Sequence, residues 1–206
     1  MEIESLMLDI SRCTLCSAEL PFDPRPILAL HSQSRLLIVG QAPGLKAHET
    51  NKPWNDASGA RLRSWLCIDE DTFYYPRHVA LLPMGFCFPG YKNNADAPPM
   101  KVCAQTWHNK VLSRINPLCT VIVGRFAQRY YANESSTLTQ AIKEQPLRHR
   151  NTWVMPHPSG RNNRWLAKNS WFTSEVLPDI QRAVAQSLLV VGEEANECVK
   201  RHRLSK

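Results

Sequence analysis

The stretch "RLLIVGQAPG", residues 35–44, places a short apolar strand directly before a loop of glycine, glutamine and proline. Leu36 to Val39 are apolar in succession, which is typical of a strand that is covered on both faces. Three further stretches have the same character: "HVALLPMGF" (78–86), "CTVIVG" (119–124) and "NTWVMPHPS" (151–159). The chain therefore contains four candidate buried strands.

Helical patterns lie between these strands. Leu62, Trp65 and Leu66 follow two good N-cap residues at helical spacing, Cys103, Trp107 and Val111 recur every four residues, and 172–188 carries a long apolar stripe. Strands that alternate with helices predict an α/β fold, a three-layer α/β/α sandwich around a four-stranded parallel sheet. Such sheets bind ligands beyond the carboxyl ends of their strands. Gln41, the loop after Phe86 and His157 should therefore lie along one rim.

Composition sets further bounds. The 206 residues are 43% hydrophobic, enough for a core, and no apolar run approaches the roughly 18 residues that span a bilayer. The acidic start is unlike a secretory signal, so we expect a cytoplasmic protein with no membrane partner. The net charge of +7 favours a polyanionic partner. We expect one domain, 1–191, and a mobile basic tail, 192–206.

Polar residues at the rim each allow a structural and a functional interpretation. Asp56 is either a helix cap or a base for water. Trp54 either packs in the core or stacks on a planar ligand, and His157 is either structural or aimed into the crevice. Arg161 and Arg164 suit phosphate contacts. "GQAPG" lacks the glycines of a dinucleotide fingerprint and the lysine of a P-loop, so a tight turn is its plainest reading.

Taken in order, "GQAPG", "PWNDASG" and "HPSGRN" resemble the motifs of the uracil-DNA glycosylase superfamily. The resemblance runs from about Cys13 to Pro178. It implies the same four-stranded α/β/α fold and DNA containing a damaged base as partner. We expect the protein to be a monomer. It also implies removal of uracil or a related deaminated base by a monofunctional glycosylase.

The resemblance assigns roles to the rim residues. Trp54 would stack on the flipped base, His157 would donate to its carbonyl oxygen, and Asp56 would position water, with Gln41 holding the water or the base edge. Further residues of the motifs would line the base and grip DNA: Gly40, Ala42, Ser159, Arg161, Asn162 and Arg164. The alternative is a damage-recognition protein of the same fold with little or no excision activity.

The seven cysteines cannot all be paired, so metal ligation, catalysis or burial must be considered. Cys13, Cys16, Cys87 and Cys103 resemble the set that holds a four-iron, four-sulfur (4Fe-4S) cluster in one branch of the superfamily. A zinc site with four thiolates, or ordinary buried thiols, are the alternatives. Cys67, Cys119 and Cys198 lie outside this pattern.

Two positions depart from the iron–sulfur branch. Gln41 stands where that branch usually has Glu, and Pro83 stands where it carries an Asn that reads the base. These differences put uracil specificity in doubt. We expect a separate branch that reads the base through backbone groups near Met84.

Overall fold

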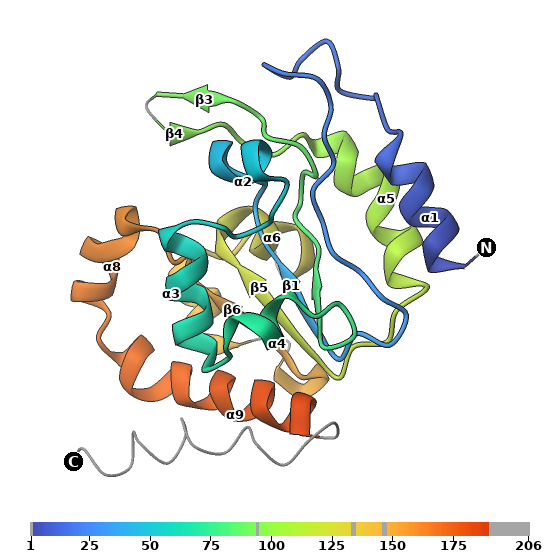
Figure 1. Ribbon diagram of the computed structural model, residues 1–206. Helices are drawn as coiled ribbons and strands as arrows, with labels where there is room; N and C mark the ends of the chain where they lie inside the picture. Colours follow the sequence, from blue (N-terminus) through green and yellow to red (C-terminus); the bar gives the residue numbers. More distant parts are fainter. Residues whose placement is uncertain (1, 94, 133–134, 146–147, 190–206) are drawn as a thin grey trace.

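The computed structural model describes residues 2–93, 95–132, 135–145 and 148–189 (Figure 1). The predicted tail, residues 192–206, lies outside this part of the chain. None of the described helices is long and apolar enough to cross a membrane.

Four parallel strands form the central sheet, in the order β2-β1-β5-β6. They are β1 (Leu36–Val39), β2 (Val79–Leu81), β5 (Cys119–Val123) and β6 (Thr152–Met155). β1 lies in the middle, where Leu37 pairs with Ala80 of β2 and with Thr120 of β5. Nearly every strand residue is buried, as the continuous apolar runs predict. All four predicted strands are present, although the strand in the stretch 78–86 covers only Val79–Leu81.

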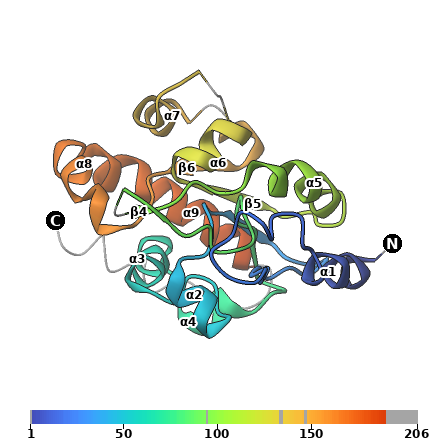
Figure 2. The same ribbon diagram turned by 90° about the horizontal axis from the view of Figure 1, so that it is seen from above.

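Helices cover both faces of this sheet, which confirms the three-layer sandwich (Figure 2). One face carries α3 (Ala57–Leu66), α4 (Glu70–Tyr74) and α9 (Leu177–Leu188). The other carries α1 (Ile3–Ser11), α5 (Lys101–Leu112) and α6 (Gly124–Tyr131), with α7 (Leu138–Glu144) beside α6. Two short helices, α2 (Leu45–Thr50) and α8 (Asn163–Lys168), follow the loops after β1 and β6.

The last amphipathic stretch is helical throughout, as predicted, but its first part is a π-helix, Phe172–Val176, that continues into α9. Three short 3-10 or π segments complete the helical structure of the described residues: Arg148–Arg150, Gly160–Asn162 and Phe172–Val176.

A small antiparallel hairpin was not predicted from the sequence. It consists of β3 (Tyr91–Lys92) and β4 (Ala95–Asp96), and it projects next to α2 at the carboxyl end of the sheet (Figure 1). Gly90, at φ +83°, turns the chain into the hairpin, and its carbonyl accepts a hydrogen bond from the N–H of Ala97 at 2.8 Å. The strands are too short for hydrophobic periodicity to reveal them.

Candidate active site

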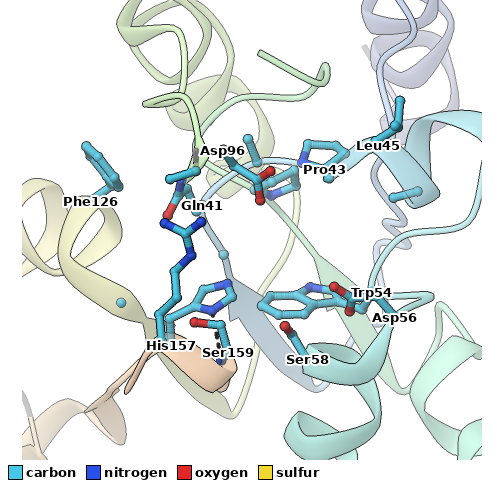
Figure 3. A pocket seen from close by; sticks show the side chains of 18 of the residues that line it. Gln41, Pro43, Leu45, Trp54, Asp56, Ser58, Asp96, Phe126, His157 and Ser159 are labelled. Atoms are coloured by element: carbon cyan, nitrogen blue, oxygen red, sulfur yellow. Dashed lines mark hydrogen bonds between the residues drawn. The ribbon is translucent and has the colours of Figure 1, made fainter. Parts of the chain in front are cut away.

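A pocket of about 860 Å³ opens at the carboxyl ends of the strands (Figure 3). Its walls come from the loop after β1, the α2–α3 connection, the β3–β4 hairpin and the loop after β6. These segments are far apart in the sequence, yet they bring the predicted rim residues into one cavity: Gln41, Trp54, Asp56, His157 and Arg161.

The loop after β1 is tied into the pocket wall. The carbonyls of Gly40 and Gln41 accept hydrogen bonds from the N–H groups of Met84 and Gly85, at 2.9 and 3.0 Å. The side-chain amide of Gln41 donates to the carbonyl of Ala97 at 3.4 Å, which links this loop to the hairpin. The predicted tight turn is thus present, and α2 follows it directly.

Trp54 lies at the base of the pocket beside His157 (Figure 3). The two rings stack with their centroids 5.5 Å apart and an interplanar angle of 27°. A Cβ atom on residue 40 would stand 2.7 Å from Cζ2 of the indole, so this packing requires Gly40. Trp54 is half-buried and its ring forms part of the pocket surface. This position fits both interpretations of Trp54: the ring packs against Gly40 and His157, and it also offers an aromatic face on which a planar ligand could stack.

Asp56 is the N-cap of α3. Its Oδ1 accepts a hydrogen bond from the N–H of Gly59 at 2.8 Å, so the capping interpretation is correct. The residue is also exposed and lines the pocket. Because a carboxylate has two oxygens with several acceptor positions, capping leaves it able to accept a hydrogen bond from water.

His157 follows β6 and faces the same pocket. Its Nδ1 accepts a hydrogen bond from the N–H of Ser159 at 3.2 Å, so the neutral ring carries its proton on Nε2. Burial lowers the pKa of His157, and the Asp56 carboxylate acts in the opposite direction. The geometry therefore favours a neutral imidazole with an Nε2–H donor. Gly124 lets this residue approach, since a Cβ there would lie 3.3 Å from that of His157.

The residues predicted to grip DNA are only partly in the pocket. Ser159, Arg161 and Asn162 line it, and the amide of Asn162 donates to the carbonyl of His157 at 2.7 Å. Arg164 lies on α8, outside the residues that line the cavity. The loop after β6 thus combines a histidine with neighbouring polar and basic groups.

The residues that were expected to read the base lie differently. Pro83 lines the pocket, whereas Met84 is buried and is not one of the lining residues. The Met84 N–H is already donated to Gly40. The carbonyl of Pro83 lies 3.0 Å from Nε2 of the buried His108, which holds this loop from behind.

Asp96 is a pocket residue that the sequence analysis missed. It projects from the hairpin into the cavity near Gln41 and Pro43 (Figure 3). Burial raises the pKa of its carboxyl group, while Arg161 lowers it and Asp56 raises it. The only sequence signal was the turn-rich composition of "GYKNNADAPP", residues 90–99, which does not show that the segment folds back over the site.

A second, much smaller pocket is lined by all four cysteines of the predicted cluster set (Cys13, Cys16, Cys87 and Cys103). It lies where three segments meet: the segment that follows α1, the loop after β2, and α5. Sγ of Cys103 accepts a hydrogen bond from the N–H of Phe86 at 3.3 Å. Burial raises the pKa of Cys87 to about 11 and that of Cys103 to about 12, so thiolates here require a compensating positive charge.

The structure brings these four thiols to one pocket. Across the described ranges, no three Cys, His, Asp or Glu residues lie in an arrangement that could hold a metal ion. A tetrahedral zinc needs four sulfurs at about 2.3 Å from one atom. A four-iron cluster is likewise held by four cysteines, so the lining of this pocket does not distinguish a cluster from a zinc ion or from ordinary buried thiols.

The comparison with protein families agrees with this geometry. Residues 29–181, about three quarters of the chain, match the family model of the uracil DNA glycosylase superfamily. The chain belongs to this superfamily. The match includes every strand of the central sheet and all the rim loops that carry Gln41, Trp54, Asp56 and His157.

Members of the uracil DNA glycosylase superfamily are generally hydrolases of DNA repair, so DNA is the partner that membership implies. Cys13 and Cys16 precede the matched residues, whereas Cys87 and Cys103 lie within them. Membership therefore carries no information on the first half of the cysteine set.

Proposed function

We propose that this protein is a monofunctional DNA glycosylase that removes uracil or a related deaminated base. The observation that carries the proposal is the meeting of an aromatic face, a neutral imidazole and a carboxylate in one pocket: Trp54, His157 and Asp56. The pocket is large enough for a flipped nucleotide, because ligand sites commonly measure about 300 to 1,000 Å³.

Breaking the glycosidic bond moves an electron pair onto the leaving base and leaves positive charge on the sugar. The Nε2–H of His157 donates to the base carbonyl oxygen as negative charge develops there. A neutral imidazole suits this role, because its orientation is already set by the Ser159 N–H and its depressed pKa keeps it neutral. Trp54 stacks on the base and holds its plane.

Asp56 completes the reaction at the sugar. Its carboxylate offsets the positive charge that develops there and orients a water molecule, whose oxygen forms the new bond to C1′ of the sugar. The water proton passes to Asp56 or to solvent. The hydrogen bond to Gly59 fixes the carboxylate at the start of α3. Gln41, held by the Ala97 carbonyl, faces the same cavity and contacts the water or the base edge.

The experiment that tests this function is a product assay on labelled duplexes that carry uracil, hypoxanthine or xanthine opposite different bases. We expect release of the free base and an intact abasic strand that breaks only on later alkaline treatment. Tight binding to damaged duplexes without release of any base would instead support the damage-recognition alternative.

We also propose that Cys13, Cys16, Cys87 and Cys103 hold a structural 4Fe-4S cluster. The cluster would join the N-terminal segment to the loop after β2 and to α5, and its positive irons would supply the charge that thiolates need at this buried position. It lies in a pocket separate from the one that holds Asp56 and His157, so no chemical step passes through it.

Metal analysis of anaerobically purified protein tests the cluster. We expect a brown protein with about four irons per chain. Cys16→Ala should lose most of the iron, whereas Cys119→Ala, which removes a buried thiol from β5, should keep it. Zinc in stoichiometric amount without iron would show that the ligands are right and the metal wrong, and full iron retention by Cys16→Ala would show that this cysteine is not a ligand.

A further inference from the structure

The backbone at Trp54 has an unusual conformation. Its φ is +55°, in the left-handed region that a bulky side chain rarely adopts. Non-glycine residues in this region persist only when their surroundings hold them there, and they cluster at functional sites. Trp54 is such a residue at the base of the candidate active site, which raises the question of what holds it.

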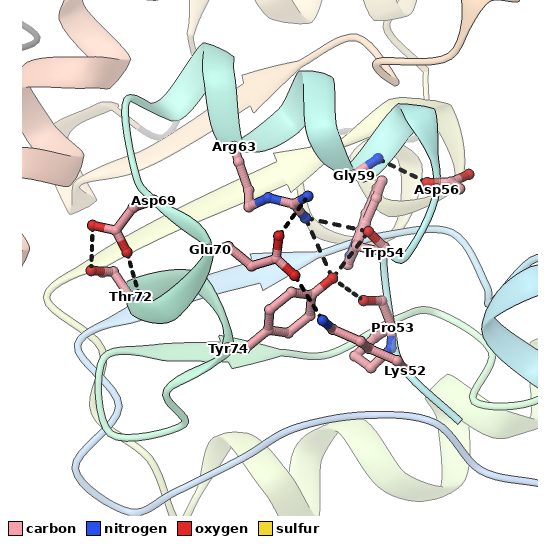
Figure 4. A network of polar contacts seen from close by, with 10 residues as sticks. All are labelled: Lys52, Pro53, Trp54, Asp56, Gly59, Arg63, Asp69, Glu70, Thr72 and Tyr74. Carbon is pink, nitrogen blue, oxygen red and sulfur yellow. Dashed lines mark hydrogen bonds and ion pairs between the residues drawn. The ribbon is translucent and has the colours of Figure 1, made fainter. Parts of the chain in front are cut away.

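Two side chains on the far side of the loop bind the Trp54 carbonyl (Figure 4). The hydroxyl of Tyr74 lies 3.2 Å from this oxygen and 3.0 Å from the carbonyl of Pro53. Nη1 of Arg63 donates to the Trp54 carbonyl at 3.4 Å and to the Tyr74 oxygen at 3.3 Å. The hydroxyl proton is therefore shared between two consecutive carbonyls, while its oxygen accepts from the guanidinium.

The donors are themselves supported. Burial raises the pKa of Tyr74, which keeps the hydroxyl protonated and able to donate. Arg63, whose side chain is only 16% exposed, lies 3.7 Å from Glu70, which pairs with Lys52 at 2.7 Å. Lys52 in turn lies over the Tyr74 ring, 4.1 Å from its centroid. The outer pair is exposed and contributes little, so the shielded contacts of Tyr74 and Arg63 matter most.

The same carbonyl also sets the start of α3. A Cβ on residue 59 would lie 1.7 Å from the Trp54 oxygen, so the carbonyl rests directly against Gly59. The N–H of Gly59 is the group that binds Asp56. The orientation of one peptide group thus fixes both the indole beside His157 and the carboxylate that faces the pocket.

From these contacts we infer that Tyr74 and Arg63 are positioning residues, which hold the Trp54 peptide in its left-handed conformation and thereby align Trp54 and Asp56 for the reaction. Neither is among the residues that line the pocket, so they act on it through the loop whose carbonyls they bind, at Pro53 and Trp54. The expected effect on rate rests on the proposed glycosylase function. The expected effect on the conformation of the Trp54 loop does not depend on that function.

The variant that tests it is Tyr74→Phe, which removes only the hydroxyl. Tyr75→Phe is the matched control, since Tyr75 is the adjacent tyrosine, is exposed, and its hydroxyl forms no hydrogen bond with the residues that the structure describes. Small displacements of a reacting group can cost up to about 100-fold in rate. We expect Tyr74→Phe to lower single-turnover excision at saturating enzyme by about tenfold, with affinity for abasic duplex changed less than about twofold.

A double variant separates positioning from general stability. If Tyr74 acts through Trp54, adding Tyr74→Phe to Trp54→Ala should reduce the rate much less than it does in the wild type. Multiplicative losses, or a wild-type rate in Tyr74→Phe, would overturn the inference.

If the wild-type protein removes none of the tested bases, the proposed function is refuted. The positioning role of Tyr74 can still be tested by NMR spectroscopy. The indole N–H resonance of Trp54 is assigned by its loss in Trp54→Phe. We expect Tyr74→Phe to shift or broaden this resonance and Tyr75→Phe to leave it in place. An unchanged Trp54 resonance in Tyr74→Phe would show that the hydroxyl does not position the loop.

Discussion

At the scale of single residues, the proposed chemistry depends on which nitrogen of His157 carries the proton. The Ser159 N–H points at Nδ1, so the ring can donate only from Nε2 while it is neutral. Protonation would place a hydrogen on Nδ1 against that N–H and would disturb the orientation of the ring. The depressed pKa thus protects the arrangement that the proposed reaction uses.

This predicts a particular pH dependence. Because the pKa of His157 is lowered from its usual value of 6.5, the neutral form persists as the pH falls through 6.5. The single-turnover rate should therefore stay level from pH 7.5 to 6.5 and fall only below that range. The measurement is a pH series under single-turnover conditions, and a rate that halves near pH 6.5 or above would argue against a depressed pKa.

Sequence reasoning reached most of these residues but not their contacts. Trp54, Asp56 and His157 follow recognisable motifs, and the structure brings all three into one pocket. Asp96 was missed because a two-residue strand has no periodicity, and Tyr74 was missed because its role depends on the left-handed conformation of a residue 20 positions away. Backbone groups near Met84 were expected to read the flipped nucleobase, but the Met84 N–H donates its hydrogen bond to the Gly40 carbonyl.

At the scale of elements, the junction between the α2–α3 loop and α3 is the critical one. The helix α3 was predictable, since its N-cap residue and its apolar spacing are local signals. The close contact between the Trp54 carbonyl and Gly59 was not, because it arises only when the loop folds back on the helix it precedes.

This junction makes Gly59→Ala a sharp test. The added Cβ would meet the Trp54 oxygen at 1.7 Å, so the loop must move. We expect a loss of about 1–3 kcal/mol in the free energy of unfolding, the usual cost of overpacking, together with a drop in excision of at least about tenfold. Ser64→Ala, an exposed change on the same helix, is the control and should leave both unchanged. Normal excision by Gly59→Ala would mean that the loop position is not critical.

At the scale of the whole molecule, the charge of +7 and the basic loop after β6 point to a phosphate backbone as the surface that is bound. The affinity for undamaged duplex should fall steeply as salt increases, because bound phosphates release counterions. Arg161→Gln should reduce the slope of log Kd against log salt concentration by about one. A slope unchanged by this substitution would place Arg161 away from the phosphates, and salt-insensitive binding would remove the electrostatic argument.

In the proposed reaction Asp56 and His157 perform the chemistry, and single-turnover excision by a variant of each residue measures their contributions. Asp56→Asn and His157→Ala should each lower the rate by roughly 100-fold or more, the scale seen when a charge-stabilising group is lost. Binding to abasic duplex and thermal unfolding, measured in parallel, should change far less for His157→Ala. For Asp56→Asn the amide oxygen can still cap α3, so the helix should survive. Folded variants that retain near-normal excision would contradict the account and leave Asp56 as a helix cap alone.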